Sequence, residues 1–81
     1  MANFKKAIEW LLDGKKIRRV EAWARSPGTY IFEHEANGIM EYNEDAYDNW
    51  EEIEGIENTG YPIMTVNDFI AHDWEIFEEV K

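Results

Sequence analysis

Residues 29–42 read TYIFEHEANGIMEY, and this stretch decides the fold that we predict. Its first part, 29–34, combines β-branched and aromatic residues, which favour an extended strand. Asn37 and Gly38 follow, and this dipeptide tolerates the positive φ angles that a tight hairpin turn requires. Residues 39–42 supply a returning strand. The centre of the chain is therefore expected to form an antiparallel hairpin.

Toward the amino terminus, the pattern changes from strand to helix. Asn3 is a good N-cap residue, and apolar residues recur at spacings of three and four over residues 4–12. Gly14 can adopt the left-handed conformation that ends a helix. Residues 15–20 include two β-branched side chains and favour a short strand. We expect a helix followed by a strand in this part.

Toward the carboxyl terminus, the signals are shorter. Residues 43–60 mix acids with cap-forming residues, which predicts a short acidic helix or an ordered loop. Residues 65–68 read TVND and resemble a capping box that opens a brief helix. Residues 73–80 favour a last strand, whose imperfect alternation is typical of an edge strand or of one partly covered by a partner subunit. We expect a single α+β domain over residues 1–81, with the N-terminal helix packed on a small, mainly antiparallel β-sheet.

Charge is distributed unevenly along the chain, whose net charge is −10. Residues 1–25 hold seven bases against three acids, a net of +4, whereas residues 26–81 hold one base against fifteen acids, a net of −14. A solvated surface is the simplest interpretation of any such charge run. A basic face for phosphates and an acidic face that imitates DNA are the functional alternatives.

Several classes of function are disfavoured because the chain lacks the residues that they require or carries them at unsuitable spacings. There is no cysteine, so thiolate metal sites and thiol nucleophiles are absent. His34 and His72 are the only histidines and lie in no metal-binding spacing, while Ser26 lies in no nucleophile elbow. We therefore expect no enzyme, no metal and no cofactor.

No long apolar segment stands out anywhere in the chain. No stretch approaches the roughly 18 apolar residues of a membrane span, and no apolar region of a signal peptide follows the first residues. The expected location is the cytoplasm, with no membrane partner.

Aromatic residues make up 15% of the chain, which is high for so acidic a domain. Most are expected in the core, because a small domain needs large apolar side chains. Trp23, however, lies between Arg18, Arg19 and Arg25 in sequence. An arginine on phosphate and a tryptophan on a base would suit a nucleotide. A strand whose arginines face solvent while Trp23 packs on the helix is the equal alternative.

Two blocks of the sequence resemble the Thoeris anti-defence type 2 family of small phage proteins, some relatives of which are described as anti-CRISPR proteins. The closing block, residues 68–76, reads DFIAHDWEI and is similar to the family motif D-x-[LI]-A-x-D-W-x-[IV]. The opening block is shared through Phe4, Ala7, Gly14, Lys15, Lys16, Ile17, Arg18, Arg19, Trp23 and Tyr30. Together the blocks cover about 30 of the 81 residues.

The resemblance implies a non-enzymatic sponge that sequesters a cyclic nucleotide immune signal in the host cytoplasm. Such a protein is a homo-oligomer, and aromatic residues stack on the bases of its ligand. Phe4 and Trp23 would supply that stacking here, and Asn67 and Asp68 would complete the pocket. We add Arg18 and Arg19 on charge grounds. Direct binding of nucleic acid is not expected from a chain of this net charge.

An alternative function comes from the acidic segment. An acidic protein can inhibit a host nuclease or another defence protein by occupying its basic nucleic-acid groove. The residues predicted to contact such a partner are Glu44, Asp45, Asp48, Glu51, Glu52 and Glu54. A structural module without any ligand is the third possibility.

Overall fold

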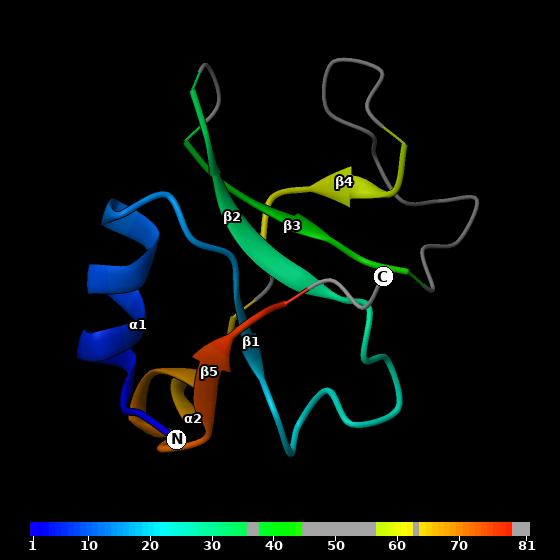
Figure 1. Cartoon of the computed structure of the whole chain (residues 1–81). Coiled ribbons are helices and arrows are strands. Elements are labelled where there is room, and N and C mark those ends of the chain that lie inside the picture. Colours follow the sequence, from blue (N-terminus) through cyan, green and yellow to red (C-terminus); the bar gives the residue numbers. More distant parts are fainter. Residues whose placement is uncertain (36–37, 45–56, 63, 79–81) are drawn as a thin grey trace.

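The structure is a computed structural model, and it describes residues 1–35, 38–44, 57–62 and 64–78. Its elements follow the chain as α1 (Phe4–Leu12), β1 (Ile17–Arg19), β2 (Tyr30–His34), β3 (Gly38–Tyr42), β4 (Thr59–Gly60), α2 (Val66–Ile70) and β5 (Trp74–Ile76) (Figure 1). The strands form one sheet in the order β4-β3-β2-β1-β5, and all neighbouring strands are antiparallel. The predicted α+β class, a helix on an antiparallel sheet, is confirmed.

The helix α1 begins and ends where its sequence indicates. The side chain of Asn3 accepts a hydrogen bond from the Lys6 amide at 3.0 Å, which satisfies one of the free amides at the helix start. Gly14 has a φ of +80° just after the helix, a conformation that costs glycine little. Ala7 and Leu11 lie one turn apart and are buried against the sheet. The apolar face of α1 therefore covers β1, β2 and β5.

The central hairpin also forms as the sequence predicts. β2 and β3 pair in a register that places Tyr30 opposite Tyr42 and His34 opposite Gly38. Gly38 has a φ of +77°, in the left-handed region that the expected turn uses. Residues 36–37 of that turn lie outside the described part of the chain.

The two faces of the sheet carry different side chains. On the face toward α1, Ile17, Ile31 and Trp74 are buried together with the helix residues. On the opposite face, the Tyr30 ring stacks on Tyr42 with centroids 5.1 Å apart. Because side chains alternate between the two faces along a strand, the consecutive residues Tyr30 and Ile31 point to opposite faces of the sheet. α1 thus covers one face of the sheet.

Two expectations need correction. Residues 59–60 form the edge strand β4, where we expected only a helix or loop; Glu41 pairs with Gly60 and Tyr42 with Thr59. Two residues are too few to show the alternation of a strand in the sequence. Residues 59–60 are a strand because they pair with β3. Residues 43–44 and 57–58 of the predicted acidic helix or loop lie in no helix, and residues 45–56 lie outside the described residues.

The last strand is shorter than the predicted range of 73–80. β5 ends at Ile76, which pairs with Ile17, the first residue of its partner strand β1. The Phe77 amide still donates to the Lys16 carbonyl at 2.8 Å just beyond the two strands, and residues 79–80 of the predicted range lie outside the described part of the chain. Its position at the edge of the sheet is confirmed, and the backbone of Ala2 hydrogen-bonds the outer side of β5 at Trp74.

Candidate functional site

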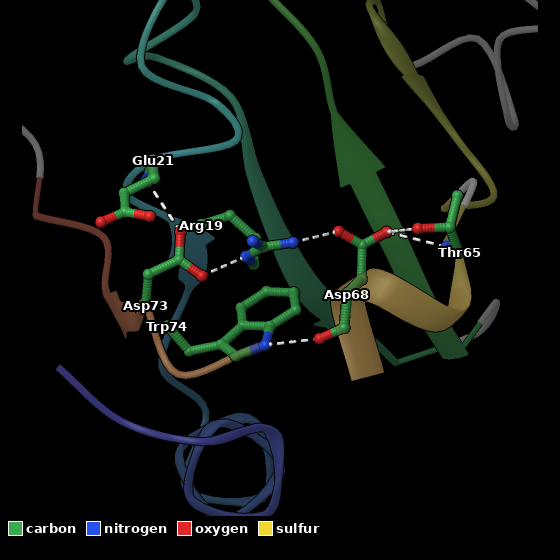
Figure 2. Close-up of polar contacts among 6 residues, drawn as sticks. All are labelled: Arg19, Glu21, Thr65, Asp68, Asp73 and Trp74. Carbon is green, nitrogen blue, oxygen red and sulfur yellow. Dashed lines mark hydrogen bonds and ion pairs between the residues drawn. The ribbon is translucent and has the colours of Figure 1, made fainter. Parts of the chain in front are cut away.

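An ion-pair network centred on Arg19 joins β1 to both ends of the 68–73 segment (Figure 2). The guanidinium of Arg19 lies between two carboxylates: Nη1 donates to Asp68 at 2.5 Å, and Nε donates to Asp73. The amide of Glu21 donates to the second oxygen of Asp73 at 2.8 Å. All three side chains of the ion pairs are about nine-tenths buried. Arg19 is therefore paired within the protein, and the three groups together keep a net charge of −1.

The network sets the charge states of its members. Burial works against ionisation of Asp73, but hydrogen bonds from Arg19 and from the Glu21 amide, with the attraction of Arg19, hold the pKa of Asp73 below its ordinary value. For Arg19, burial works against the charge, but the hydrogen bonds and charges of Asp73 and Asp68 raise its pKa. The pair is thus ionised over the whole physiological pH range.

Asp68 also holds α2 on the sheet. Asp68 accepts from the Thr65 amide at 2.8 Å, and the Thr65 hydroxyl donates to the same oxygen at 3.2 Å. This is the capping box that the sequence predicts, with aspartate in the glutamate position. The Asp68 carbonyl accepts from Trp74 Nε1 at 2.9 Å (Figure 2). Asp68 is therefore a structural residue with its side chain and carbonyl both in use.

Both aromatic residues predicted to stack on a ligand contact Trp74. The ring centroid of Phe4 lies 5.4 Å from that of Trp74, and the ring of Trp23 meets Trp74 edge-on at 5.8 Å. Phe69 packs edge-on against Phe4 at 5.1 Å. Phe4 and Trp23 are half-buried, so each has a packing role within its own chain and an exposed part.

Arg18, the neighbour of Arg19, lies in a different environment. Its Nη1 lies 3.5 Å from Glu75 Oε1, and its Nη2 donates to the Trp23 carbonyl at 3.4 Å. Both contacts are longer than the 2.7–2.9 Å typical of charge-assisted hydrogen bonds. The Nε of Arg18 is buried with no hydrogen-bond partner. One of the three guanidinium nitrogens thus has no partner, and the other two are held by long contacts.

A hollow of about 470 Å³ adjoins Arg18 at the β5 edge of the sheet. Trp10 of α1 and Phe77 contribute aromatic rings to its wall, and the other lining residues are Pro27, Glu75, Ile76 and Glu78. A cation beside aromatic rings is an arrangement that suits a phosphate linked to a flat base. The residues Trp10 and Phe77 were not singled out by the sequence analysis, because their apolar character fits a core position equally well.

Asn67 borders a second hollow, of about 390 Å³, together with Arg19, His72 and Asp73. Asn67 is exposed on α2. The structure therefore brings Arg19, Asn67 and Asp68 together on one side and places Phe4 and Trp23 around Trp74. Arg18 lies apart from Arg19, Asn67 and Asp68, but it hydrogen-bonds the Trp23 carbonyl.

Two functional groups that the sequence analysis missed are carboxylates. Asp73 completes the Arg19 network, and Glu41 is only 6% exposed on β3. The signal for Glu41 was present, because alternation along residues 38–42 places it on the same face as Ile31, its partner on β2. Of the six acids predicted to contact a basic partner, Glu44 is exposed, and the others lie outside the described residues.

The described residues contain no group of three or more histidine or acidic side chains that could hold a metal ion. Across the same ranges, no helix is both long and apolar enough to cross a membrane. Comparison of the chain with protein-family models, curated proteins and solved structures gave no match. The resemblance to the Thoeris anti-defence type 2 family therefore stays a prediction that rests on the residues quoted above.

Proposed function

We propose that this protein is a phage-type counter-defence protein that sequesters a cyclic nucleotide immune signal in the host cytoplasm without catalysis. The observation that carries the proposal is Arg18: its side chain is about 85% buried, its Nε is buried with no hydrogen-bond partner, and it borders a hollow of about 470 Å³. A buried cation with unused donors favours an anion, since an unsatisfied buried donor costs about 1–3 kcal/mol.

The hollow beside Arg18 suits both parts of a nucleotide. A phosphate would accept from the Arg18 guanidinium in place of the long contact to Glu75. Trp10 and Phe77 offer rings on which a base can stack, worth on the order of 1–3 kcal/mol per base. The ligand would therefore be held by one charge contact and by stacking, with no reacting group required.

A homo-oligomer would bring further predicted residues to the ligand. Phe4, Trp23 and Asn67 keep exposed surface away from the Arg18 hollow, so they would contact a ligand bound to a second subunit. Val66, Phe69 and Ile70 expose at least half of their surface on α2 and offer an apolar contact area for that subunit. Light scattering tests this part: a dimer or larger assembly is expected, and a monomer at all concentrations would contradict it.

Calorimetric titration with cyclic ADP-ribose isomers and with cyclic dinucleotides tests the proposed ligand. We expect one of these compounds to bind with a Kd of about 10 µM or tighter. The bound compound should be released chemically unchanged by denaturing the protein, as chromatography of the supernatant would establish. Absence of binding across the panel, or conversion of the ligand, would contradict the proposal.

A matched pair of variants assigns the binding to Arg18. Arg18→Gln removes the charge in the hollow, and we expect it to weaken binding by about tenfold or more, because charge-assisted hydrogen bonds are the strong ones. Lys5→Gln removes one charge from the same basic part of the chain at an exposed position on α1. Equal loss of affinity in the two variants would point to general charge attraction instead of a site.

The acidic inhibitor of a host nuclease or other defence protein is the second candidate, favoured by the net charge of −14 over residues 26–81. It would bind a basic partner in a complex that weakens steeply with salt. The triple variant Glu51→Gln, Glu52→Gln and Glu54→Gln should abolish that inhibition while leaving nucleotide binding intact. The opposite result, lost nucleotide binding with inhibition retained, would contradict the assignment of inhibition to the acidic segment.

A further inference from the structure

A third hollow, of about 190 Å³, lies between the 20–29 loop and β3. Its lining includes Trp23, Arg25 and Ser26 from the loop, and Glu41 and Asn43 from the strand and the residue after it. It is separate from the Arg18 hollow, with which it shares no lining residue. The proposed nucleotide site therefore does not account for it.

Glu41 is an unusual residue for such a place. It is 6% exposed, and no lysine or arginine forms an ion pair with it among the described residues. Burial, partly offset by a hydrogen bond from Asn43 and reinforced by the charge of Asp68, raises the pKa of Glu41. A buried carboxylate without a cationic partner is costly, and the cost falls when the group takes up a proton or when a partner is supplied.

The wider charge balance points in the same direction. Asp68, whose charge acts on Glu41, already shares the single guanidinium of Arg19 with Asp73, so that cation is engaged by two other carboxylates. This region therefore has an excess of negative charge. A positively charged or strongly hydrogen-bond-donating group would relieve it.

The chemistry of the walls selects among cations. A divalent metal ion requires several oxygen ligands, and the described residues contain no group of three or more metal-binding side chains. A guanidinium fits better, because its planar donors match the fork of a carboxylate and its flat face stacks on an indole ring. Glu41 and Trp23 both line this hollow and provide these two features.

We propose that the hollow between the 20–29 loop and β3 binds a guanidinium group, with Glu41 as its carboxylate partner and Trp23 as its stacking surface. The guanidinium belongs either to a free small molecule or to an arginine side chain of a protein. Arg25 borders the same hollow and is exposed, so its own guanidinium is the intramolecular competitor for Glu41.

Nuclear magnetic resonance titration of the full chain tests the site. The probes are agmatine as a free guanidinium and N-acetyl-arginine amide as a stand-in for a protein side chain, with N-acetyl-lysine amide as the control. We expect saturable shifts of the Trp23 indole N–H and the Glu41 amide with both guanidinium probes below about 10 mM, and weaker shifts with the lysine probe. Tighter binding of the amide than of agmatine would assign the site to a protein side chain, and the reverse to a small molecule.

Three variants make the test decisive. Glu41→Gln should weaken guanidinium binding by about tenfold, whereas Glu33→Gln, at an exposed position on β2, should leave it unchanged. Arg25→Ala should strengthen binding, because it removes the competitor.

The proposal is overturned if the probes give no saturable shift, if Glu41→Gln binds as tightly as the unmodified chain, or if Arg25→Ala weakens binding or leaves it unchanged. Should Glu41→Gln fail to fold, the exposed Arg25→Ala variant decides the question alone, because tighter binding supports the site and weaker or unchanged binding contradicts it.

Discussion

Arg18 and Arg19 are adjacent in the sequence and both side chains are largely buried, yet they lie in two regions that differ in how the guanidinium donors are used. Alternation along β1 sends their side chains to opposite faces of the sheet. Arg19 meets two carboxylates and has its donors satisfied, whereas Arg18 has long contacts and an unpartnered Nε. Neighbouring arginines in a basic cluster can therefore differ in role. One can be held in ion pairs that stabilise the fold, while the other keeps unpartnered donors.

The two regions also differ in how they are held. Around Arg19, Trp74 is fully buried, and its indole N–H is bonded to the backbone of α2. Around Arg18, Trp10 is only half-buried and borders a hollow. We therefore expect substitutions near Arg19 to affect stability and substitutions near Arg18 to affect binding.

The largest expected effect is that of Trp74→Ala. Removing this buried ring leaves a cavity beneath Phe4 and Trp23 and should cost about 3–5 kcal/mol of unfolding free energy. Trp10→Ala, on the Arg18 side, should cost about 1–2 kcal/mol, because less of its surface is buried. Urea unfolding followed by circular dichroism measures both, and equal costs would break the distinction between the two regions.

Next in size is the contrast between the two arginines themselves. Arg19→Met leaves Asp68 and Asp73 buried without their cation and should cost about 3 kcal/mol. Arg18→Met removes only long contacts together with the unpartnered Nε, so it should lower stability by less than about 1 kcal/mol or raise it. The same unfolding measurement compares them. Similar losses in both variants would show that the Arg18 contacts are as important for stability as those of Arg19.

Because of the Arg19 region, the stability of the folded protein should also depend on pH in the acid range. The pKa of Asp73 is lowered in the folded state, so the stability that it contributes is present above its ordinary value of 3.8 and is lost as the pH falls through the lower, folded value. Asp73→Asn should reduce stability at neutral pH and flatten the fall in the acid range. Thermal unfolding between neutral and strongly acidic pH checks this, and an unchanged acid slope would contradict it.

The smallest expected effect concerns the attachment of α2. Thr65→Val keeps the shape of the side chain but removes the hydroxyl that bonds Asp68, and should cost about 1 kcal/mol. For a domain of this size, that corresponds to a fall of about 4–8 °C in Tm. Asn67→Ala, at an exposed position of the same helix, should change Tm little. A larger effect at Asn67 would indicate that it, too, holds α2 in place.

Much of the fold could be predicted from the sequence because local signals are strong where elements are long. Asn3 and Gly14 bound α1, and the central hairpin follows from its β-propensity and its Asn-Gly turn. The capping box at Thr65 was also recognisable. β4 was missed because two residues have no periodicity of their own, and their pairing depends on β3.

The sequence analysis predicted the types of residue in the candidate site but not which of them lie together. Charge and aromatic content indicated arginines and rings, but the residues meant to act together lie in three places. Trp10, Phe77 and Glu41 were missed, because a half-buried aromatic residue and an interior acid look ordinary in sequence. Their importance comes from which neighbours the sheet brings beside them.

The sequence by itself determined the class of fold, the helix ends and the hairpin, since these depend on conformational preferences of residues close together in the chain. Only the tertiary structure decided that Arg19 is neutralised by Asp68 and Asp73, 49 and 54 residues away, while Arg18 borders a hollow. The physical reason is that the free energy of a charge depends on its partners and its burial, and both are supplied by residues distant in sequence.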